Sequence, residues 1–340
     1  MIKFGIIGYG HIGKRHASHI LQQKDAVLTA ICDIETVDIS ALNSTAPIAV
    51  YHDVADFLAQ ESLDIVSVCT PNYLHAAHAI ACMKAGVHVI VEKPLALSVE
   101  ECHEMDKVSK ETGKLIFPVK QNRYNPPVSL SKEWIDDGKL GDLYMIQVNC
   151  FWNRNDAYYE QSEWRGKKAK DGGCLFTQFS HFVDILYYLT GDMKAVKGLM
   201  NNYLHQHNTE FEDTGSFVLK SANGAIINFN FTTCSYQQNM EGSITLMGSQ
   251  GTIKIGGQYL NTIEYQTSAY GTLPPVKITE KSNDYGFYQG SMSNHDKVIE
   301  NVMNVLQNNG KIMTSVAQAT AVVAIIEDMY QSAKIFDKIS

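Results

Sequence analysis

Short apolar runs alternate with helix-like segments along the first third of the chain. A continuous apolar run of roughly four to eight residues is typical of a strand buried on both faces, as in a parallel sheet covered by helices. The runs lie at residues 3–7, 26–32, 48–51, 63–69, 87–91 and 115–119, and the helix-like segments at 54–60, 73–85 and 98–112. This order predicts an α/β domain at residues 1–120, built on a doubly wound parallel sheet.

The pattern changes after residue 120. A helix is predicted at about residues 127–137, and strand-like runs follow at residues 143–152, 214–220, 225–233, 243–247 and 252–255. Asn223-Gly224 and residues 248–251 are typical hairpin turns. Apolar positions recur at helical spacing in residues 172–189, and two more helices are predicted between about residues 293 and 339. We therefore predict an α+β domain at residues 121–340, with an antiparallel sheet and interspersed helices.

Composition narrows the classes of protein to consider. The 340-residue chain is 45% hydrophobic and 19% charged, which fits two folded domains and excludes a disordered protein. Its net charge of −8 argues against nucleic acid or an anionic membrane as the main partner. We expect no signal peptide and no membrane span. The seven scattered cysteines indicate reduced thiols, so a cytoplasmic location is expected.

Three glycines follow the first predicted strand in the pattern Gly8-x-Gly10-x-x-Gly13. Gly8 permits a tight turn, Gly10 lets the backbone approach a pyrophosphate, and Gly13 allows close packing of helix on strand. The second apolar run ends at Asp33, where a carboxylate would accept hydrogen bonds from a ribose. A glycine-rich turn without a ligand is the alternative, but strand, turn, helix, strand and acid in this order favour a dinucleotide. No arginine lies near Asp33 to bind a 2′-phosphate, which favours NAD over NADP.

Two further strand ends are expected at the cofactor, because ligands of such sheets lie beyond the carboxyl ends of the strands. One is followed by Thr70, Asn72 and His75, although Asn72 could simply cap the next helix. The other leads into Glu92-Lys93-Pro94, where a cis bond before the proline is possible. A partly buried ammonium group is suited to acid–base work near neutral pH. Taken alone, this tripeptide could equally form a surface ion pair.

Four motifs together resemble the glucose–fructose oxidoreductase, inositol dehydrogenase and rhizopine catabolism (Gfo/Idh/MocA) family. They are Gly8-x-Gly10-x-x-Gly13-x-x-His16, Thr70-Pro71-x-x-x-His75, Glu92-Lys93-Pro94 and Gly172-Gly173…His181-x-x-Asp184. The resemblance implies an N-terminal Rossmann domain and a C-terminal α+β domain with a large, open, mostly antiparallel sheet that forms homodimers or homotetramers. It also implies a sugar or polyol substrate, with Lys93 and His181 as the acid–base groups. The family often has an aspartate where this chain has Thr177, so the proton relay is expected to depend on Lys93 and His181.

Two segments resemble a subfamily, the bacterial UDP-N-acetyl-glucosaminuronic acid (UDP-GlcNAcA) 3-dehydrogenases. They are residues 119–126 and 151–166. The resemblance implies oxidation of the C3 hydroxyl of a nucleotide sugar for surface polysaccharide. Arg123, Arg154 and Arg165 would then bind the uronate and the diphosphate, with neighbouring aromatic rings as stacking faces. Each arginine taken singly could instead form a surface salt bridge, and His181 could be a core histidine.

The expected site therefore has a cofactor part and a substrate part, and we expect no metal. The cofactor residues are Gly8, Tyr9, Gly10, His11, Ile12, Gly13, Asp33, Cys69, Thr70, Asn72, His75, Glu92, Lys93, Gln121, Trp164 and Arg165. The substrate residues are Lys93, Arg123, Tyr124, Asn125, Arg154, Tyr158, Thr177, Gln178 and His181. A dehydrogenase of free sugars or inositol and a non-catalytic NAD-sensing protein remain as alternatives.

Overall fold

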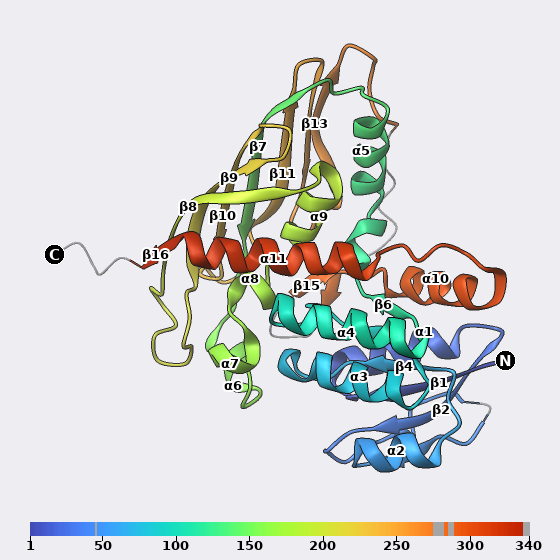
Figure 1. Cartoon of the computed structure of the whole chain (residues 1–340). Helices are drawn as coiled ribbons and strands as arrows, with labels where there is room; N and C mark the ends of the chain where they lie inside the picture. The colour runs from blue at the N-terminus through green and yellow to red at the C-terminus, as the bar shows by residue number, and fades with distance from the viewer. Residues whose placement is uncertain (45, 275–281, 285–288, 336–340) are drawn as a thin grey trace. The chain divides into compact units, whose positions relative to one another are not determined.

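The computed structural model describes residues 1–44, 46–274, 282–284 and 289–335 (Figure 1). The chain forms two compact units, and one boundary falls after Lys120, where the sequence pattern changes. The first unit contains Met1–Lys120 together with His295–Val323, and the second contains Gln121–Asn294 together with Ala324–Ser340. Residues 295–323, which the sequence pattern grouped with the second domain, return to the first unit because helix α10 packs against helix α1.

The first unit is built on a six-stranded parallel sheet with the order β3-β2-β1-β4-β5-β6. Its strands are β1 (Ile2–Ile7), β2 (Ala26–Cys32), β3 (Ala49–Tyr51), β4 (Ile65–Val68), β5 (His88–Val91) and β6 (Ile116–Pro118). This confirms the predicted doubly wound sheet, and β4 is buried along its whole length. The strand order reverses between β1 and β4, which is where such sheets bind dinucleotides.

Two helices of the first unit, α2 (Val54–Gln60) and α4 (Val99–Thr112), start at side chains that satisfy free backbone N–H groups. The others are α1 (His11–Leu21), η1 (Asn72–Leu74), α3 (His75–Lys84) and α10 (His295–Asn308). Asp53 accepts hydrogen bonds from the N–H groups of Ala55 and Asp56 at the start of α2. Ser98 accepts one from the N–H group of Glu101 at the start of α4.

The second unit is built on an eight-stranded sheet with the order β13-β12-β11-β7-β10-β9-β8-β16. Its strands are β7 (Leu143–Phe151), β8 (Met193–Asn201), β9 (Thr214–Ser221), β10 (Ile226–Thr232), β11 (Glu241–Gly248), β12 (Gly251–Gly256), β13 (Thr262–Ser268) and β16 (Ala333–Ile335). The β7–β10 and β8–β16 pairs are parallel and the others antiparallel, so the predicted mostly antiparallel sheet is confirmed. A separate pair joins β14 (Ser282–Asp284) and β15 (Gln289–Met292).

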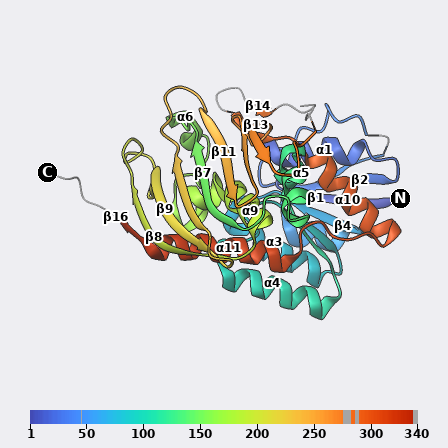
Figure 2. The same cartoon turned by 90° about the horizontal axis from the view of Figure 1, so that it is seen from above.

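Helices pack on one face of this sheet (Figure 2). They are η2 (Gln121–Tyr124), α5 (Pro126–Asp136), α6 (Asp156–Glu160), α7 (Lys168–Asp171), α8 (Cys174–Thr177), α9 (Ser180–Thr190) and α11 (Val316–Ser332), whose last turns belong to this unit. The rings of Phe179 and Phe231 lie 5.2 Å apart, and those of Trp152 and Phe182 lie 5.4 Å apart. These aromatic contacts attach α9 to the sheet.

Three parts of the second unit differ from the pattern-based prediction. The helix expected over residues 172–189 is broken into α8 and α9 at Gln178 and Phe179. Strands β8 and β13 were missed because few of their positions are buried, so neither shows a continuous apolar run. The last predicted helix ends at Ser332, where β16 begins, and its expected residues 336–339 lie outside the described part of the chain.

Candidate active site

The glycine turn after β1 has the geometry expected for each of its three glycines. Gly8 has φ +90°, and a Cβ there would lie 2.7 Å from the backbone carbonyl of Cys69. A Cβ on Gly13 would lie 2.0 Å from the carbonyl oxygen of Gly8, so this glycine is required for α1 to approach β1. A Cβ on Gly10 would meet open space. The N-terminus of α1 and the space over Gly10 therefore suit a phosphate group.

Asp33, at the end of β2, is attached to the glycine turn. Its carboxylate accepts hydrogen bonds from the backbone N–H of Tyr9 and, at 2.9 Å, from that of Glu35. Its carbonyl oxygen lies 2.8 Å from Nδ1 of His52. Asp33 is partly exposed, so an acid stands next to the turn as the motif requires. Its contact with a ribose stays a prediction.

The segment after β4 is tied to the segment after β5 by His75. Its Nδ1 lies 2.7 Å from the carbonyl oxygen of Pro94, and its Nε2 lies 2.9 Å from that of Thr70. Burial lowers the pKa of His75, although both carbonyl contacts favour the protonated ring. Asn72 is the first residue of η1 and does not occupy the cap position before it, which is Pro71.

Lys93 follows β5 and is half-buried, and the Lys93–Pro94 peptide bond is cis, as the sequence allowed. The neighbouring Glu92 is 5% exposed and was expected to contact the cofactor. Its carboxylate instead contacts protein groups: Nε2 of His16 at 2.9 Å, Nε2 of His295 at 3.2 Å and the backbone N–H of Lys93 at 3.1 Å. A direct contact between Glu92 and the cofactor stays a prediction.

In the second unit, Arg123 forms a buried, two-pronged ion pair with Asp184. The distances are 3.0 Å from Nε to Oδ2 and 2.8 Å from Nη2 to Oδ1, and the arginine is fully buried. The guanidinium also lies 4.8 Å from the ring centre of Tyr188. The pair fastens η2 to α9, so Asp184 of the His181-x-x-Asp184 motif serves as an anchor for the helix that carries His181.

Arg154 lies in a stack of aromatic rings and guanidinium groups. Its guanidinium carbon is 5.1 Å from the ring centre of Trp152 and 5.3 Å from that of Tyr158. Arg165 covers the same Tyr158 ring at 4.2 Å and that of Trp164 at 5.0 Å. Two guanidinium groups therefore stack on the ring of Tyr158, so two positive charges lie close together beside aromatic rings. We call Trp152, Arg154, Tyr158, Trp164 and Arg165 the arginine–aromatic stack.

Polar side chains fix the direction of Arg154 within this stack. Its Nε donates to Oε1 of Gln178 at 2.8 Å, and its Nη1 donates to the carbonyl oxygen of Asn153 at 2.6 Å. Gln178 in turn donates to the hydroxyl of Tyr158. The break between α8 and α9 thus places Gln178 against the stack, and three of the expected substrate residues come together: Arg154, Tyr158 and Gln178.

The hydroxyl of Thr177 is bound to a buried carboxylate that the sequence motif did not reveal. It donates to Oδ1 and, at 2.9 Å, to the backbone carbonyl of Asp171, which is fully buried. The other carboxylate oxygen accepts the backbone N–H of Gly166 at 2.9 Å. Asp171 immediately precedes Gly172-Gly173, so an acid is present near the position where the family has one. His181 is buried in the first turn of α9.

Asn125, another expected substrate residue, has structural partners. Its amide donates to the carbonyl oxygens of Tyr259 at 3.1 Å and Leu260 at 3.3 Å, and its own oxygen accepts from Asn294 at 2.6 Å. Its role at a substrate stays a prediction, as do those of Tyr124 and Gln121.

A buried acid holds the start of α8 in place. Oε1 of Glu212 accepts the backbone N–H of Cys174 at 3.1 Å and the hydroxyl of Tyr330 at 2.6 Å. A Cβ on Gly173 would lie 2.2 Å from that hydroxyl, which explains why a glycine is needed there. Burial raises the pKa of Glu212. Sequence patterns gave no signal for this contact, because Glu212 and Tyr330 lie far from Gly173 in the sequence.

His205 supports the backbone of Arg154 and was also missed. Its Nε2 lies 2.7 Å from the carbonyl oxygen of Arg154, and its Nδ1 lies 3.2 Å from Oδ2 of Asp213. Both neighbours only accept hydrogen bonds, so both ring nitrogens must carry protons. Burial opposes this charge, but the hydrogen bonds to Asp213 and Cys234 raise the pKa of His205 to about 10.

Two groups of described side chains bring three possible metal donors within 4.8 Å of one another. They are His16, Glu92 and His295, and His205, Asp213 and Cys234. In each group the carboxylate contacts an imidazole nitrogen at a hydrogen-bond distance, 2.9 Å and 3.2 Å respectively. Hydrogen bonding therefore accounts for both arrangements.

Comparison with known families identifies the fold and its chemistry. Residues 2–119 match the Gfo/Idh/MocA oxidoreductase family with its NAD-binding Rossmann fold, and residues 128–254 match the C-terminal domain of the same family. The chain belongs to the Gfo/Idh/MocA family. This is an oxidoreductase family, NAD is the cofactor of its Rossmann domain, and the relatives of the chain include proteins named as dehydrogenases.

Two solved structures of WlbA dehydrogenases, each in complex with NADH and UDP-GlcNAcA, are similar to this Gfo/Idh/MocA protein over nearly the whole chain. The enzyme from Bordetella pertussis is 34% identical with a TM-score of 0.85, covering 97% of this chain and 96% of that one. The enzyme from Chromobacterium violaceum is 31% identical with a TM-score of 0.86, covering 97% and 93%.

A curated relative has a different substrate in its name. It is the scyllo-inositol 2-dehydrogenase (NADP(+)) IolW of Bacillus subtilis, 31% identical, with a match that spans 57% of this chain and 53% of that protein. The match to another curated relative spans 60% of its length. The relatives of this Gfo/Idh/MocA chain therefore include dehydrogenases of polyols and of nucleotide sugars.

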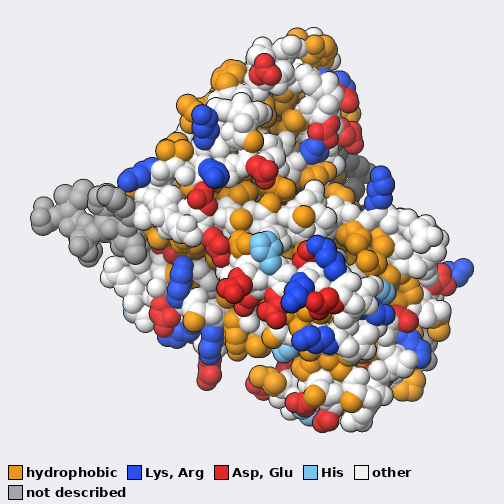
Figure 3. All heavy atoms as spheres, viewed as in Figure 1, with side chains coloured by type: hydrophobic (Ala, Val, Ile, Leu, Met, Phe, Trp, Pro, Cys, Tyr) orange, Lys and Arg blue, Asp and Glu red, His pale blue; other side chains and the backbone are white. Residues whose placement is uncertain are grey.

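Surface charge, helix length and the state of the cysteines complete the description of the chain. Acidic and basic side chains are interspersed over the face shown in Figure 3. Within the part of the chain that the structure describes, no helix combines the length and the apolar character needed to cross a membrane. The seven cysteines are all free, and five of them are buried.

Proposed function

We propose that this protein is an NAD-dependent dehydrogenase of a nucleotide sugar, and that it oxidises the C3 hydroxyl of UDP-N-acetyl-glucosaminuronic acid. The observation that carries the proposal is the arginine–aromatic stack. A substrate with a uronate and a diphosphate needs several cationic groups, and its uracil and sugar rings need flat apolar faces. A neutral polyol such as inositol needs neither.

The two arginines of the stack carry this argument, since Arg123 is already bound by Asp184. Arg154 is 2% exposed, and its guanidinium is held by Gln178 and Asn153. Arg165 is partly exposed and stacks on Tyr158. Such preordered groups bind an anion without first losing much conformational freedom. The similarity to WlbA enzymes solved with UDP-GlcNAcA supports the same substrate class.

The chemistry requires a proton acceptor as well as the cofactor. Oxidation of a secondary alcohol transfers hydride from the carbon to C4 of the nicotinamide, and the hydroxyl proton leaves to a base. The products are a ketone, NADH and a proton. We assign proton removal to Lys93 and proton passage to His181. Thr177 cannot act as a carboxylate base, and its hydroxyl is committed to Asp171.

A single-turnover experiment tests the proposal. Enzyme and NAD in equal amounts are mixed separately with UDP-N-acetyl-glucosaminuronic acid, UDP-N-acetyl-glucosamine, glucose and myo-inositol, and NADH is followed by its near-ultraviolet absorbance. A burst with the uronate alone is expected. A burst only with glucose or inositol would leave the family and cofactor in place and exclude the nucleotide sugar. No burst with any of the four would contradict the proposed substrate and leave an NAD-sensing role as the alternative.

The expected homodimer or homotetramer stays a prediction. Leu199, Val218 and Ile226, from three neighbouring strands, are exposed on the sheet face of the second unit. An exposed apolar face of this kind is typical of surfaces between subunits.

A further inference from the structure

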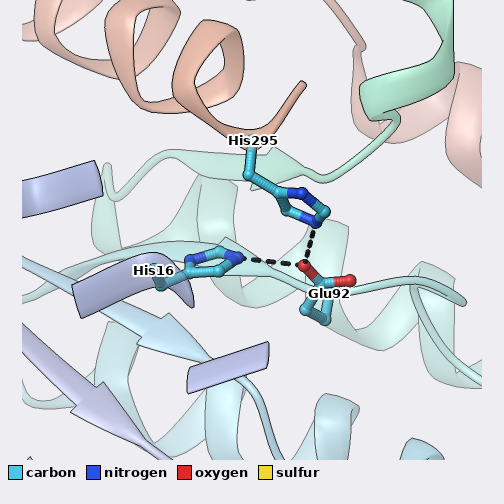
Figure 4. A group of neighbouring side chains, drawn as sticks. All are labelled: His16, Glu92 and His295. Atoms are coloured by element: carbon cyan, nitrogen blue, oxygen red, sulfur yellow. Dashed lines mark hydrogen bonds and ion pairs between the residues drawn. The ribbon is translucent and has the colours of Figure 1, made fainter. Parts of the chain in front are cut away.

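Three buried side chains from distant parts of the sequence meet beside Lys93 (Figure 4). His16 comes from α1, Glu92 follows β5, and His295 opens α10; none is more than 5% exposed. Both Nε2 atoms point at the same oxygen, Oε1 of Glu92, from 2.9 Å for His16 and 3.2 Å for His295. We call these three residues the Glu92 cluster.

Both oxygens of Glu92 and both ring nitrogens of His16 have partners. Oε2 of Glu92 accepts the backbone N–H of Lys93 at 3.1 Å, so the carboxylate has partners on both oxygens. Nδ1 of His16 lies 3.1 Å from Oγ of Ser67, which is fully buried. Donation from Nε2 of His16 to Glu92, with Nδ1 accepting the hydroxyl proton of Ser67, gives both ring nitrogens a partner. On the carboxylate, Oε1 thus has the hydrogen bond with Nε2 of His16 and Oε2 accepts the amide of Lys93, while Nε2 of His295 lies at ion-pair distance from Oε1.

The cluster keeps Glu92 ionised. Burial raises the pKa of a carboxyl group, yet the hydrogen bonds from His16 and His295 hold the pKa of Glu92 well below its usual value. Burial lowers the pKa of His295, so this ring is neutral at pH 7. Glu92 is therefore a buried anion next to the ammonium group of Lys93. Other charged or titratable groups face it: Arg15, Cys69, His75 and Lys93.

We propose that His295 is a positioning residue, which acts through Glu92 to fix the backbone turn that carries Lys93. The inference rests on the proposed role of Lys93 and deepens it. The turn is held on both sides, because Glu92 binds the N–H of Lys93 and His75 binds the carbonyl of Pro94. A base must lie within hydrogen-bond reach of the proton that it removes, so a small displacement of the turn slows the reaction.

This role explains why residues 295–323 return to the first unit. The six-stranded sheet and its own helices supply Glu92 and His16, but they do not supply the second imidazole. The first residue of α10 supplies it, and α10 packs against α1, which carries His16. The turn that carries Lys93 is therefore completed by a segment that follows strands β7–β13 of the second sheet in the sequence.

Variants of His295 test the proposal in the complete protein with NAD bound. In His295→Gln an amide N–H can still reach Glu92, whereas His295→Phe has no donor. We expect His295→Phe to lower kcat about 10- to 100-fold while the Kd for NADH stays within about twofold, and we expect His295→Gln to stay within about threefold of the wild type. His88→Gln is the matched control, because His88 lies at the opposite end of β5. Equal kcat in His295→Phe and the wild type would overturn the proposal.

A second measurement does not depend on turnover. Lysines are ¹³C-dimethylated, and the Lys93 resonance is assigned by its loss in Lys93→Arg. We expect this resonance to move in His295→Phe and to coincide with that of the wild type in His295→Gln and His88→Gln. An unmoved resonance in folded His295→Phe would overturn the inference even if no substrate turned over, so its failure is distinguishable from that of the proposed function. Should the phenylalanine variant not fold, His295→Asn, whose shorter amide does not reach Glu92, carries the same test.

The glutamine variant also distinguishes hydrogen bonding from metal binding. An amide nitrogen donates a hydrogen bond but is a poor metal ligand, unlike an imidazole. One metal ion per chain in the wild type, lost in His295→Gln together with activity, would overturn the hydrogen-bond role. Retained activity and equal metal content in the two proteins are expected.

Discussion

The two units stabilise buried charges of opposite sign by different means. In the first unit, Glu92 is a buried anion surrounded by imidazole and amide donors next to Lys93. In the second, His205 is a buried cation between a carboxylate and the carbonyl of Arg154. We propose that the first arrangement positions Lys93 for proton transfer and that the second fixes the backbone of Arg154 for substrate binding. The two networks should therefore respond to different substitutions and at opposite ends of the pH scale.

The largest expected effect separates catalysis from binding in the first unit. Lys93→Ala removes the proposed base, and kcat should fall about 10²- to 10⁴-fold, the usual contribution of such a group. The Kd for NAD should change little, because the glycine turn and Asp33 are untouched. Stopped-flow absorbance for turnover and quenching of protein fluorescence for NAD binding give the two numbers.

Lys84→Ala is a matched control for this substitution, since Lys84 lies on the last turn of α3 in the same unit, away from the strand ends. It should leave both numbers unchanged. Full turnover in Lys93→Ala would contradict the assignment of Lys93 as the base. The Glu92 network would then no longer be expected to position a proton-transferring group.

The next effect concerns the second unit. Arg154→Lys keeps the positive charge but loses the planar fork that stacks on Trp152 and Tyr158 and binds Gln178. We expect KM for the nucleotide sugar to rise about 10- to 100-fold, equivalent to about 1.4–2.7 kcal/mol, while the Kd for NAD stays the same. Steady-state kinetics with varied sugar concentration measure this.

A nearby exposed lysine provides the control. Lys167 pairs with Glu210 at 3.2 Å and is half-exposed, so Lys167→Met removes a charge from the same loop without removing a stacked fork. A similar rise in KM for both variants would mean that general charge, and not the arginine–aromatic stack, attracts the substrate.

Features that depend on residues close together in the sequence were predictable, whereas contacts between residues far apart in the sequence were not. The tight turn at Gly8 and the close helix–strand packing at Gly13 follow from spacing within one turn, and the strands of the parallel sheet are continuous apolar runs, so both were predicted correctly. The ion pair of Arg123 with Asp184 joins residues 61 positions apart, and a single sequence gives no signal for such a pair. The contact of His295 with Glu92 was missed for the same reason. Strand β8 was missed because most of its side chains are not buried.

The smallest effect tests the cation of the second unit. The pKa of His205 is raised to about 10 in the folded protein from an ordinary value of 6.5, so its contribution to stability is complete below about pH 6.5 and is lost as the pH rises through about 10. After allowance for solvent screening, we expect the free energy of unfolding of the wild type to fall by about 1–2 kcal/mol more than that of His205→Gln between pH 8 and pH 10.5. Urea unfolding at several pH values measures the difference.

His207→Gln is the control, because His207 forms an exposed ion pair with Asp156 at 3.0 Å, and exposed pairs contribute little. Loss of the His205 proton weakens the contact with the carbonyl of Arg154, so KM for the nucleotide sugar should rise at alkaline pH before kcat falls. Parallel loss of kcat and of affinity in this range would mean that His205 supports the unit as a whole and does not act through Arg154. The pKa of Glu92 is lowered, so its contribution to stability is lost at acid pH, whereas that of His205 is lost at alkaline pH. The two networks would then still differ in the pH dependence of stability, but His205 would have no separate effect on substrate binding.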